Sequence, residues 1–445
     1  MVRGRILLGL TLLIGCAGLA PAQALFSEDF KGVASLADRG WTVEATPEQS
    51  EWSVENGHLT AVCHRRPYRG GRIVHEVPVI QRGVLELDCL FARDGITDYD
   101  HLSLGLRLYG QMMAFKRYGG HLWMVYRPAE KTYHIVTDRV PLGEWTHLRM
   151  EFDIPHRRAE FYLGDDPDPL LIITDLSMTP EGETGELELF NYGLTKGTVV
   201  NLVDNIVLRG IEPAAEAVGA ERTRALVFRG MTSERYRALE AMQAALGPER
   251  VSAYTLMTRG AATFPRNKLV LDRVPGAATW REARWIVLED MPAGPGDVLP
   301  GYLLDDLQRA VRDGASLLVL AGPFSLGKGA WQGTPLEAML PVTVGGPWSL
   351  TRLDEPASLS PCPDVPAVRW YHDVALVEDA TPGALTVAGK PMIASHAFGE
   401  GLVIVFLAAP LGDPAEFGDA PPFWEWDGWP DLVRSLAGVG GGEAQ

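Results

Sequence analysis

The sequence predicts two folded domains of different class, an all-β sandwich over residues 25–212 and an α/β domain with a parallel sheet over residues 224–445. In the first segment, short runs of alternating polar and apolar residues are separated by Gly, Pro and Asp turns, which is typical of antiparallel strands with one buried face. In the second, strands alternate with helices, the rhythm of a parallel sheet. Residues 213–223 are rich in Ala, contain no aromatic residue and are expected to be the linker.

The composition fits a folded protein whose partners are not nucleic acids. The 445 residues are 46% hydrophobic, enough to bury a sizeable core. The formal net charge is −17, and no basic run interleaved with aromatic residues is present. Both features oppose attraction to a polyphosphate backbone.

The N-terminus has the order of an export signal. Arg3 and Arg5 precede an apolar stretch from Ile6 to Ile14, and small residues lead to Ala22-Gln23-Ala24. We expect a signal peptide over residues 1–24 and a periplasmic or extracellular protein. An alternative is that Leu13-Ile14-Gly15-Cys16 resembles the lipobox of bacterial lipoproteins, in which case Cys16 would carry a lipid anchor.

The cysteines do not indicate a zinc site, because no two of Cys16, Cys63, Cys89 and Cys362 are closely spaced. Cys63 and Cys89 share strand parity with apolar neighbours. We expect them to be small buried residues, and a disulfide between them is the alternative in an oxidising compartment.

Two strand segments of the first domain carry the predicted ligand-binding residues. Leu102, Leu104, Leu106 and Leu108 are expected on the core face of one strand, with Arg107 and Tyr109 on its polar face. In the segment HLWMVYRP, Trp123 and Arg127 are likewise expected on the face opposite Leu122, Met124 and Tyr126. An exposed aromatic ring can stack on a pyranose while Arg bonds its hydroxyls. The alternative is that Trp123 packs under a loop.

The segments FSEDF, GWTVE, EWSVENGHL, GEWTHLRMEFD and VDNIVLRG resemble the concanavalin A-like lectin/glucanase jelly roll of the LamG type. The resemblance implies a jelly-roll sandwich with a polysaccharide or other glycan as partner, on a fold that hosts lectins, adhesion modules and glycosidases. Glycosidase chemistry is disfavoured, because Phe91 stands where a second Glu should follow Glu86 and Asp88. Glu186 and Glu188 repeat the alternation, so both pairs are expected on solvated strand faces.

Four aspartates of the first domain could bind Ca²⁺ through oxygen ligands: Asp94, Asp98, Asp100 and Asp204. Their pattern does not match an EF-hand, and turn formation is the favoured role. No other metal or cofactor is expected.

The second domain is predicted to begin with strand RALVFRG and helix SERYRALEAMQAAL, capped by Ser233. Strand REARWIVLEDMP, helix LPGYLLDDLQRAVRDG and strand ASLLVLAG follow. The second helix has Leu303, Leu304, Leu307 and Val311 on one stripe and Gly314 as its stop. Thr334, Pro335 and Glu337 predict another helix start, with an N-cap, a proline at the first position and a capping-box acid.

The glycine-rich loop before that helix is the predicted site of the second domain. It follows a strand at the carboxyl edge of the sheet, where open α/β sheets bind ligands. Its candidate residues are Gly322, Phe324, Ser325 and Gly327. The loop does not match a phosphate-binding loop, because Gly329 follows Lys328.

From residue 222 to 437 the chain resembles class I glutamine amidotransferase-like domains, which have a flavodoxin-like fold. The resemblance rests on the glycine-rich turn leading into TPLE and LPV, on FGEGLVIVF and on FWEWDGWPDLVRSL. The family's catalytic Cys is missing from the turn, Cys362 lies in SPCPDVP, and His396 is followed by Ala397-Phe398 instead of x-Glu. The resemblance therefore implies the fold without the amidotransferase activity, a pseudoenzyme.

The resulting hypothesis is an exported, noncatalytic recognition or assembly protein that handles carbohydrate. A further possibility is that the second domain serves mainly as an oligomer interface. The alternative is a secreted hydrolase of a glycan, ester or amide, with Ser325 as nucleophile and His372 or His396 as base. Pro323 weakens it, because it replaces the first Gly of a Gly-x-Ser-x-Gly elbow. We expect the C-terminal tryptophans to pack the last helix on the sheet or to contact the other domain: Trp370, Trp424, Trp426 and Trp429.

Overall fold

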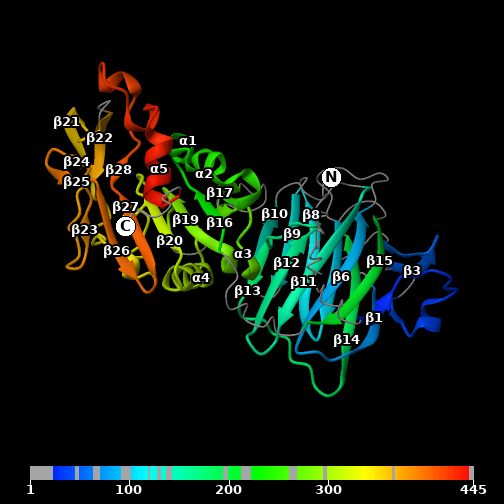
Figure 1. The fold of residues 1–445 in the computed structure, drawn as a ribbon. Helices are drawn as coiled ribbons and strands as arrows, with labels where there is room; N and C mark the ends of the chain where they lie inside the picture. Colours follow the sequence, from blue (N-terminus) through cyan, green and yellow to red (C-terminus); the bar gives the residue numbers. More distant parts are fainter. Residues whose placement is uncertain are drawn as a thin grey trace, which may run out of the picture.

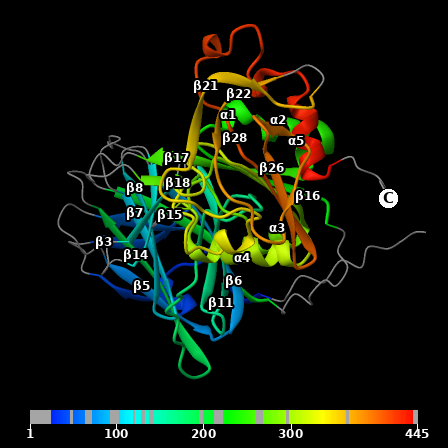
Figure 2. The ribbon, with the colours of Figure 1, turned by 90° about the vertical axis from the view of Figure 1, so that its left-hand side faces the viewer.

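A computed structural model gives the fold (Figures 1 and 2). The structure describes residues 24–45, 50–63, 71–91, 102–118, 121–127, 132–136, 143–193, 199–211, 222–259, 268–293, 298–362 and 366–439. Within these ranges, no helix has the length and apolar character needed to cross a membrane. The expected signal peptide with Cys16, most of the expected linker, and Asp94, Asp98 and Asp100 lie outside them.

The first domain is a sandwich of two antiparallel sheets, which confirms the all-β prediction. One sheet has the order β13-β12-β11-β6-β15-β4-β3, with β1 also paired to β15. Its strands are β1 (Ala24–Glu28), β3 (Ser50–Glu55), β4 (His58–Cys63), β6 (Arg82–Phe91), β11 (Trp145–Asp153), β12 (Arg158–Leu163), β13 (Leu171–Ile173) and β15 (Val199–Gly210). The other has the order β10-β9-β8-β7-β14-β5-β2. Its strands are β2 (Thr42–Glu44), β5 (Arg72–Pro78), β7 (Leu102–Leu108), β8 (Gln111–Tyr118), β9 (His121–Arg127), β10 (Thr132–Val136) and β14 (Thr184–Gly193).

The core of the sandwich lies between the two sheets and follows the predicted alternation. Leu104, Leu106 and Leu108 are buried on β7, and so are Leu148, Met150 and Phe152 on β11. Cys89 is a free, buried thiol, so it is the small apolar core residue that the parity predicted and not half of a disulfide. Burial raises the pKa of this thiol.

The second domain has a sheet whose central strands are parallel, in the order β17-β16-β19-β20-β27. These strands are β16 (Arg224–Arg229), β17 (Val251–Arg259), β19 (Ala283–Glu289), β20 (Ser316–Leu320) and β27 (Gly401–Phe406). Antiparallel strands extend both edges: β18 (Lys268–Leu271), β26 (Ile393–Phe398) and β23 (Thr381–Pro382). Two small sheets lie outside it, one of β21 (Leu350–Ser358), β22 (Ala367–His372) and β28 (Ala408–Ala409), the other of β24 (Thr386–Val387) and β25 (Lys390–Pro391).

Helices cover both faces of the parallel sheet. α3 (Ala277–Glu282) and α4 (Gly301–Arg312) share one apolar cluster with the sheet, and α2 (Ala238–Leu246) and α5 (Trp429–Ala437) share the other. The predicted apolar stripe of α4 is buried, and Gly314 has the left-handed φ of 108° expected beyond its end. Trp429 is fully buried and its Nε1 donates to Tyr236 O, so α5 is packed on the sheet by a tryptophan as predicted. The 3₁₀ helices are Leu36–Arg39, Pro248–Arg250, Glu337–Met339, Pro414–Phe417 and Phe423–Glu425.

Two helix predictions were wrong in detail. The helix expected from Ser233 is divided into α1 (Ser233–Tyr236) and α2 by Arg237, which has φ 50°. The division turns the amide of Ala238 toward the buried carboxylate of Glu289, 2.7 Å away. The helix expected from Thr334 is only the 3₁₀ turn Glu337–Met339, because Pro341 follows closely and cannot continue a helix.

The two domains contact each other directly through the loop after β12 (Figure 1). Asp168, 2% exposed, accepts hydrogen bonds from Tyr254 Oη at 2.9 Å and Thr279 Oγ1 at 2.6 Å. Arg273 pairs with Asp166 at 2.8 Å. Because these buried and half-buried polar groups bond across the interface, they hold the domains in one arrangement.

Candidate functional site

The carboxyl edge of the parallel sheet brings together the ends of three strands. Thr232 follows β16, Asp290 follows β19 and the glycine-rich loop follows β20. Asp290 has a left-handed φ of 47° and no exposed surface. Its Oδ1 accepts from Phe324 N at 2.6 Å, and its Oδ2 accepts from Thr232 Oγ1 at 3.0 Å. The carboxyl group therefore fastens all three strand ends to one another.

Burial makes this carboxyl group hard to ionise. Desolvation raises the pKa of Asp290 to about 7, although the bonds from Phe324 and Thr232 oppose the shift. Burial likewise raises the pKa of the adjacent Glu289 to about 8. Both side chains point inward, so they are structural groups held by their neighbours.

Ser325 is fully buried beside this carboxyl group. Its Oγ lies 3.5 Å from Asp290 Oδ1. A Cβ on Gly322 would stand 2.4 Å from Asp290 Cγ, and one on Gly327 would stand 1.9 Å from Gly346 O. The loop is therefore packed too closely to leave a cleft over Ser325.

Neither histidine bonds to Ser325. His372 is 2% exposed, with Nε2 3.0 Å from Gly322 O and Nδ1 2.8 Å from Ser349 Oγ. His396 bonds Met339 O through Nε2 at 2.6 Å. Both imidazoles are committed elsewhere, so the arrangement required for Ser325 as a nucleophile is not assembled.

His372 instead forms a pair with Ser349, which the sequence did not suggest. Gly322 O can only accept, so Nε2 carries the ring proton and Nδ1 accepts from the Ser349 hydroxyl. Burial lowers the pKa of His372 to about 4, so the ring is neutral at pH 7. Ser349 is partly exposed and follows Trp348, whose ring lies 4.6 Å from Lys328 Nζ.

The outer face of the sandwich carries a second polar cluster. His147 on β11, Asp88 on β6, Asp204 on β15 and His58 on β4 lie side by side across four neighbouring strands. His147 Nδ1 is 2.9 Å from Asp88 Oδ1, and His58 Nδ1 is 2.9 Å from Asp204 Oδ2. We call these four residues the His-Asp row.

Trp145 lies over the His-Asp row. Its ring centroid is 5.0 Å from that of His58, although β6 and β15 separate their strands. The indole therefore lies across the intervening strands, and Trp145 is 43% exposed. A bulge after Asp204 gives Asn205 a left-handed φ of 49° and brings its Nδ2 to 2.7 Å from Asp88 Oδ2.

The row keeps unused hydrogen-bonding capacity. Among the described residues, Nε2 of His58, Nε2 of His147 and Oδ1 of Asn205 have no hydrogen-bond partner. The exposed indole of Trp145 packs against one of them, His58. Within the described ranges, no three His, Cys, Asp or Glu side chains are placed to hold a metal ion.

Of the ligand-binding residues predicted on the other sheet, Arg107 lies on the polar face and Tyr109 does not. Tyr109 is 5% exposed, and its hydroxyl donates to Pro78 O at 2.5 Å. Its predicted binding role was wrong, because φ 47° at the strand end turns the ring into the core. Arg107 bonds both oxygens of Glu188 at 2.8 and 2.9 Å. Glu188 is 4% exposed and also bonds Arg72, so it is not the solvated residue that was expected.

Trp123 and Arg127 lie on β9, and their side chains are outside the described part of the structure. β9 is third from β14 in the sheet, after β8 and β7. Phe190 on β14 is half-buried, and the ring covers Gly105 on β7, where a Cβ would meet it at 1.8 Å. This face therefore has one aromatic surface among the described residues.

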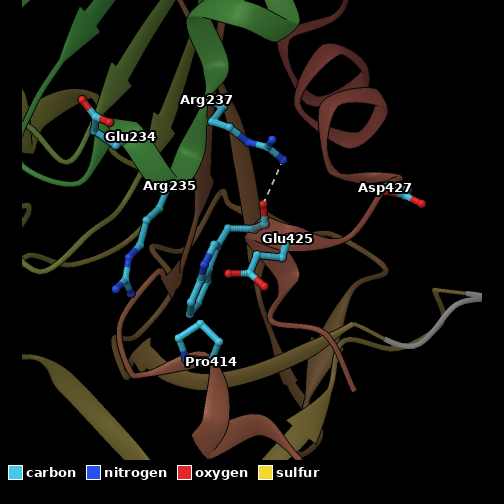
Figure 3. A pocket seen from close by; sticks show the side chains of 7 residues that line it. Glu234, Arg235, Arg237, Pro414, Glu425 and Asp427 are labelled. Atoms are coloured by element: carbon cyan, nitrogen blue, oxygen red, sulfur yellow. Dashed lines mark hydrogen bonds between the residues drawn. The ribbon is translucent and has the colours of Figure 1, made fainter. Parts of the chain in front are cut away.

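A hollow of about 380 Å³ lies between α1 and the C-terminal segment (Figure 3). Arg235 lies over the ring of Trp424 and donates to the carbonyls of Pro410 and Gly412. Arg237 donates to Trp424 O, the dashed bond of Figure 3. Trp424 is 4% exposed, so this hollow is a joint between two segments and offers no open aromatic ring.

No protein-family model matches the chain, and no curated protein matches it. Several solved structures are similar to part of it. A cytoplasmic protein from Salmonella typhimurium is 15% identical, with 49% of this chain and 98% of its own covered and a TM-score of 0.32. A β-1,3-glucanase from Mycobacterium marinum is 14% identical, with 42% and 100% covered and a TM-score of 0.31. An endo-β-1,4-glucuronan lyase from Trichoderma reesei is 12% identical, with 42% and 96% covered and a TM-score of 0.29. At these values the similarities assign no family and no activity.

Sequence reasoning noted Glu86 and Asp88 but missed the row that Asp88 belongs to. The alternation of side chains along the strand GEWTHLRMEFD places Trp145 and His147 on its polar face, so both could have been named as candidate binding residues. Their contact with His58 and Asp204 could not be predicted, because it depends on which strands are neighbours in the sheet.

Proposed function

We propose that the protein is an exported, noncatalytic glycan-binding protein and that its sandwich domain binds sugar at Trp145 and the His-Asp row. The observation that carries this proposal is the exposed indole of Trp145, which packs against His58 at one end of a row of side chains with spare donors and acceptors. Sugars present an apolar face of C–H groups and an edge of hydroxyls. An open aromatic ring fits the first, and imidazole and amide groups fit the second.

The second domain is proposed to be a flavodoxin-like, amidotransferase-related domain without activity. The strand order supports it: numbered along the chain, the five parallel strands lie in the order 2-1-3-4-5. In such sheets, ligands bind where the strand order reverses, here between β16 and β19. Asp290 and Thr232 fill that position with their own hydrogen bond, which argues for a retained scaffold.

The test is a glycan array probed with the mature chain from Leu25 and with Trp145→Ala. We expect the variant to lose about tenfold or more in affinity for the glycans that bind, since an aromatic contact contributes on the order of 1 kcal/mol beyond area burial. Trp348→Ala is the matched control, because Trp348 is 54% exposed on the other domain. This variant should bind the glycans with wild-type affinity. Wild-type affinity in Trp145→Ala would refute the site.

The predicted set on the opposite sheet is tested separately with Arg107→Gln, Trp123→Ala and Arg127→Gln. If glycan binding is lost in these variants and kept in Trp145→Ala, the ligand lies on the β9 side of the sandwich. The lipid-anchor alternative is tested with Cys16→Ser in a bacterial host, where membrane retention that disappears in the variant would support acylation.

Ser349 provides a second candidate function, a hydrolase, because its hydroxyl donates to a neutral imidazole. A nucleophilic Ser needs such a base. Here a carbonyl, not a carboxylate, holds the far side of the ring, and it stabilises the imidazolium less well. We expect a fluorophosphonate probe to leave the protein unlabelled. Labelling that disappears in Ser349→Ala and persists in Ser325→Ala would establish the hydrolase instead.

A further inference from the structure

Two adjoining hollows lie at the interface between the domains. One, of about 350 Å³, is lined by β11, β12 and α3. The other, of about 330 Å³, is lined by α3 and α4. Arg158, Ala277 and Arg281 line both, so the two hollows form one groove, which we call the interdomain groove.

The interdomain groove is rich in arginine, although the chain as a whole has a net charge of −17. Six arginines line it: Arg82, Arg149, Arg158, Arg222, Arg281 and Arg309. Guanidinium groups match the geometry of planar and tetrahedral oxyanions better than any other side chain. Five carboxylates line the same groove, Glu151, Asp153, Glu160, Asp306 and Asp313, so the arginines that matter are those the carboxylates do not bond.

Some of these arginines are satisfied by the protein. Arg158 pairs with Glu160 at 2.9 Å and with Asp306 at 3.4 Å across the interface. Arg82 pairs with Asp153 at 2.9 Å, and Arg309 pairs with Asp306 at 3.0 Å. These pairs hold the walls of the groove in place.

Two arginines of the first hollow form no hydrogen bond to another described side chain. Arg281 on α3 is exposed and forms no ion pair with another described residue. Arg149 lies 4.0 Å from the ring centroid of Tyr162, and its buried Nε forms an ion pair with Glu151 Oε1 at 3.4 Å but no hydrogen bond within the described ranges. The side chain is 25% exposed, so an external acceptor would bind at the terminal Nη groups and not at the buried Nε. The ring holds the guanidinium in place for such a contact.

Glu151 lies beside Arg149 in the same hollow. Burial raises the pKa of its carboxyl group, and the Arg149 guanidinium opposes this shift.

We propose that the interdomain groove binds a small ligand that carries an oxyanion, with the anion between Arg149 and Arg281. The uncharged part of the ligand would lie against Ala277, Ala278 and Ile211, the apolar lining of the same hollow. The volume suits a ligand of one or two sugar units. The shared chemistry is a carboxylate, sulfate or phosphate group, as in a uronic acid, a sulfated sugar or a phosphate ester.

The ligand would also strengthen the contact between the domains. Arg149 belongs to the sandwich and Arg281 to the second domain, so one anion touches both. A ligand that binds only the assembled form stabilises it by an amount that grows with its concentration. We expect the melting temperature of the full chain to rise with the ligand.

The test uses the mature full chain, titrated calorimetrically with galacturonate and glucuronate oligosaccharides, sulfated galactose and inorganic phosphate, and with neutral glucose as the blank. At least one anionic arm should bind and raise the melting temperature, and the arm that binds identifies the anion. Arg281→Gln and Arg149→Gln should each weaken that binding about tenfold or more. Arg250→Gln, an exposed arginine that does not line the groove, should bind as the wild type does.

Binding by none of the anionic arms, or wild-type affinity in both Arg281→Gln and Arg149→Gln, would overturn the proposal. Arg281 is exposed, so its substitution should not impair folding, which a melting curve checks. Trp145→Ala should leave anion binding intact. Loss of the sugar site at Trp145 and loss of the interdomain groove are therefore distinguishable results.

Discussion

The carboxyl edge of the parallel sheet and the His-Asp row of the sandwich are built from similar residue types and differ in availability. At the sheet edge, Asp290, Ser325 and His372 are each 2% exposed or less; Ser325 Oγ bonds Asp290, and His372 bonds Gly322 O and Ser349. On the sandwich, Asp88 and His147 are about a third exposed, and Trp145 is 43% exposed. The same chemistry serves as internal fastening in one place and is open to a ligand in the other.

This comparison shows that the location of polar residues on a fold is a weak indicator of function. The sheet edge has the location in which α/β domains bind ligands, and its polar groups are used up internally. The sandwich face keeps groups without partners. Unused hydrogen-bonding capacity at an exposed position is the better indicator of a binding site. A buried polar group must be paired internally, because leaving it unpaired would cost about 1–3 kcal/mol, whereas an exposed one can exchange water for a ligand.

The first prediction contrasts Asp290→Ala with Asp88→Ala. At pH 5, where the folded Asp290 is protonated, Asp290→Ala should lower the free energy of unfolding by about 3 kcal/mol, since Phe324 N and Thr232 Oγ1 lose their buried hydrogen-bond partner. Asp88→Ala should lower it by less than about 1 kcal/mol, because His147 and Asn205 can be hydrated instead. Urea unfolding of both variants measures the difference. Equal losses would mean that the two clusters do not differ in the way described.

The second prediction concerns pH. In the unfolded chain, the Asp290 carboxyl group has its ordinary pKa of 3.8. In the folded protein, burial raises this pKa to about 7. The folded state therefore holds an extra proton between these values. The stability that this proton contributes is complete below pH 4 and is lost as the pH rises through about 7, at up to about 1.4 kcal/mol per pH unit.

Asp290→Asn removes this dependence while its amide can still accept from Phe324 N and donate to Thr232. We expect the variant to gain stability relative to the wild type as the pH rises from 4 to 7, with no further gain above about 8. Glu289 is present in both proteins, so its titration cancels. Denaturant unfolding at five pH values tests this. A difference that stays constant with pH would show that Asp290 ionises normally in the folded protein.

The parts of this fold that follow local rules could be predicted from sequence. The alternation of Leu104, Leu106 and Leu108 is set by the period of a strand, and the stripe of α4 by the period of a helix. Tyr109 escaped the same rule because a left-handed residue at the strand end reverses its side. Ser325 was named as a candidate nucleophile with His372 or His396 as its base, but which partner each side chain bonds is decided by packing. The His-Asp row was missed because it joins four strands that are distant in sequence.

The smallest expected effect is on the stability of Trp145→Ala. The indole is 43% exposed and packs over the sheet surface outside the core, so its removal should cost about 0.5–1 kcal/mol, against about 3–5 kcal/mol for a buried tryptophan. Trp429→Ala is the matched comparison, because Trp429 is fully buried and bonds Tyr236 O. Thermal unfolding should rank the two far apart. A large loss in Trp145→Ala would show that the indole mainly stabilises the sandwich, and the exposed ring would then no longer distinguish the His-Asp row from the sheet edge.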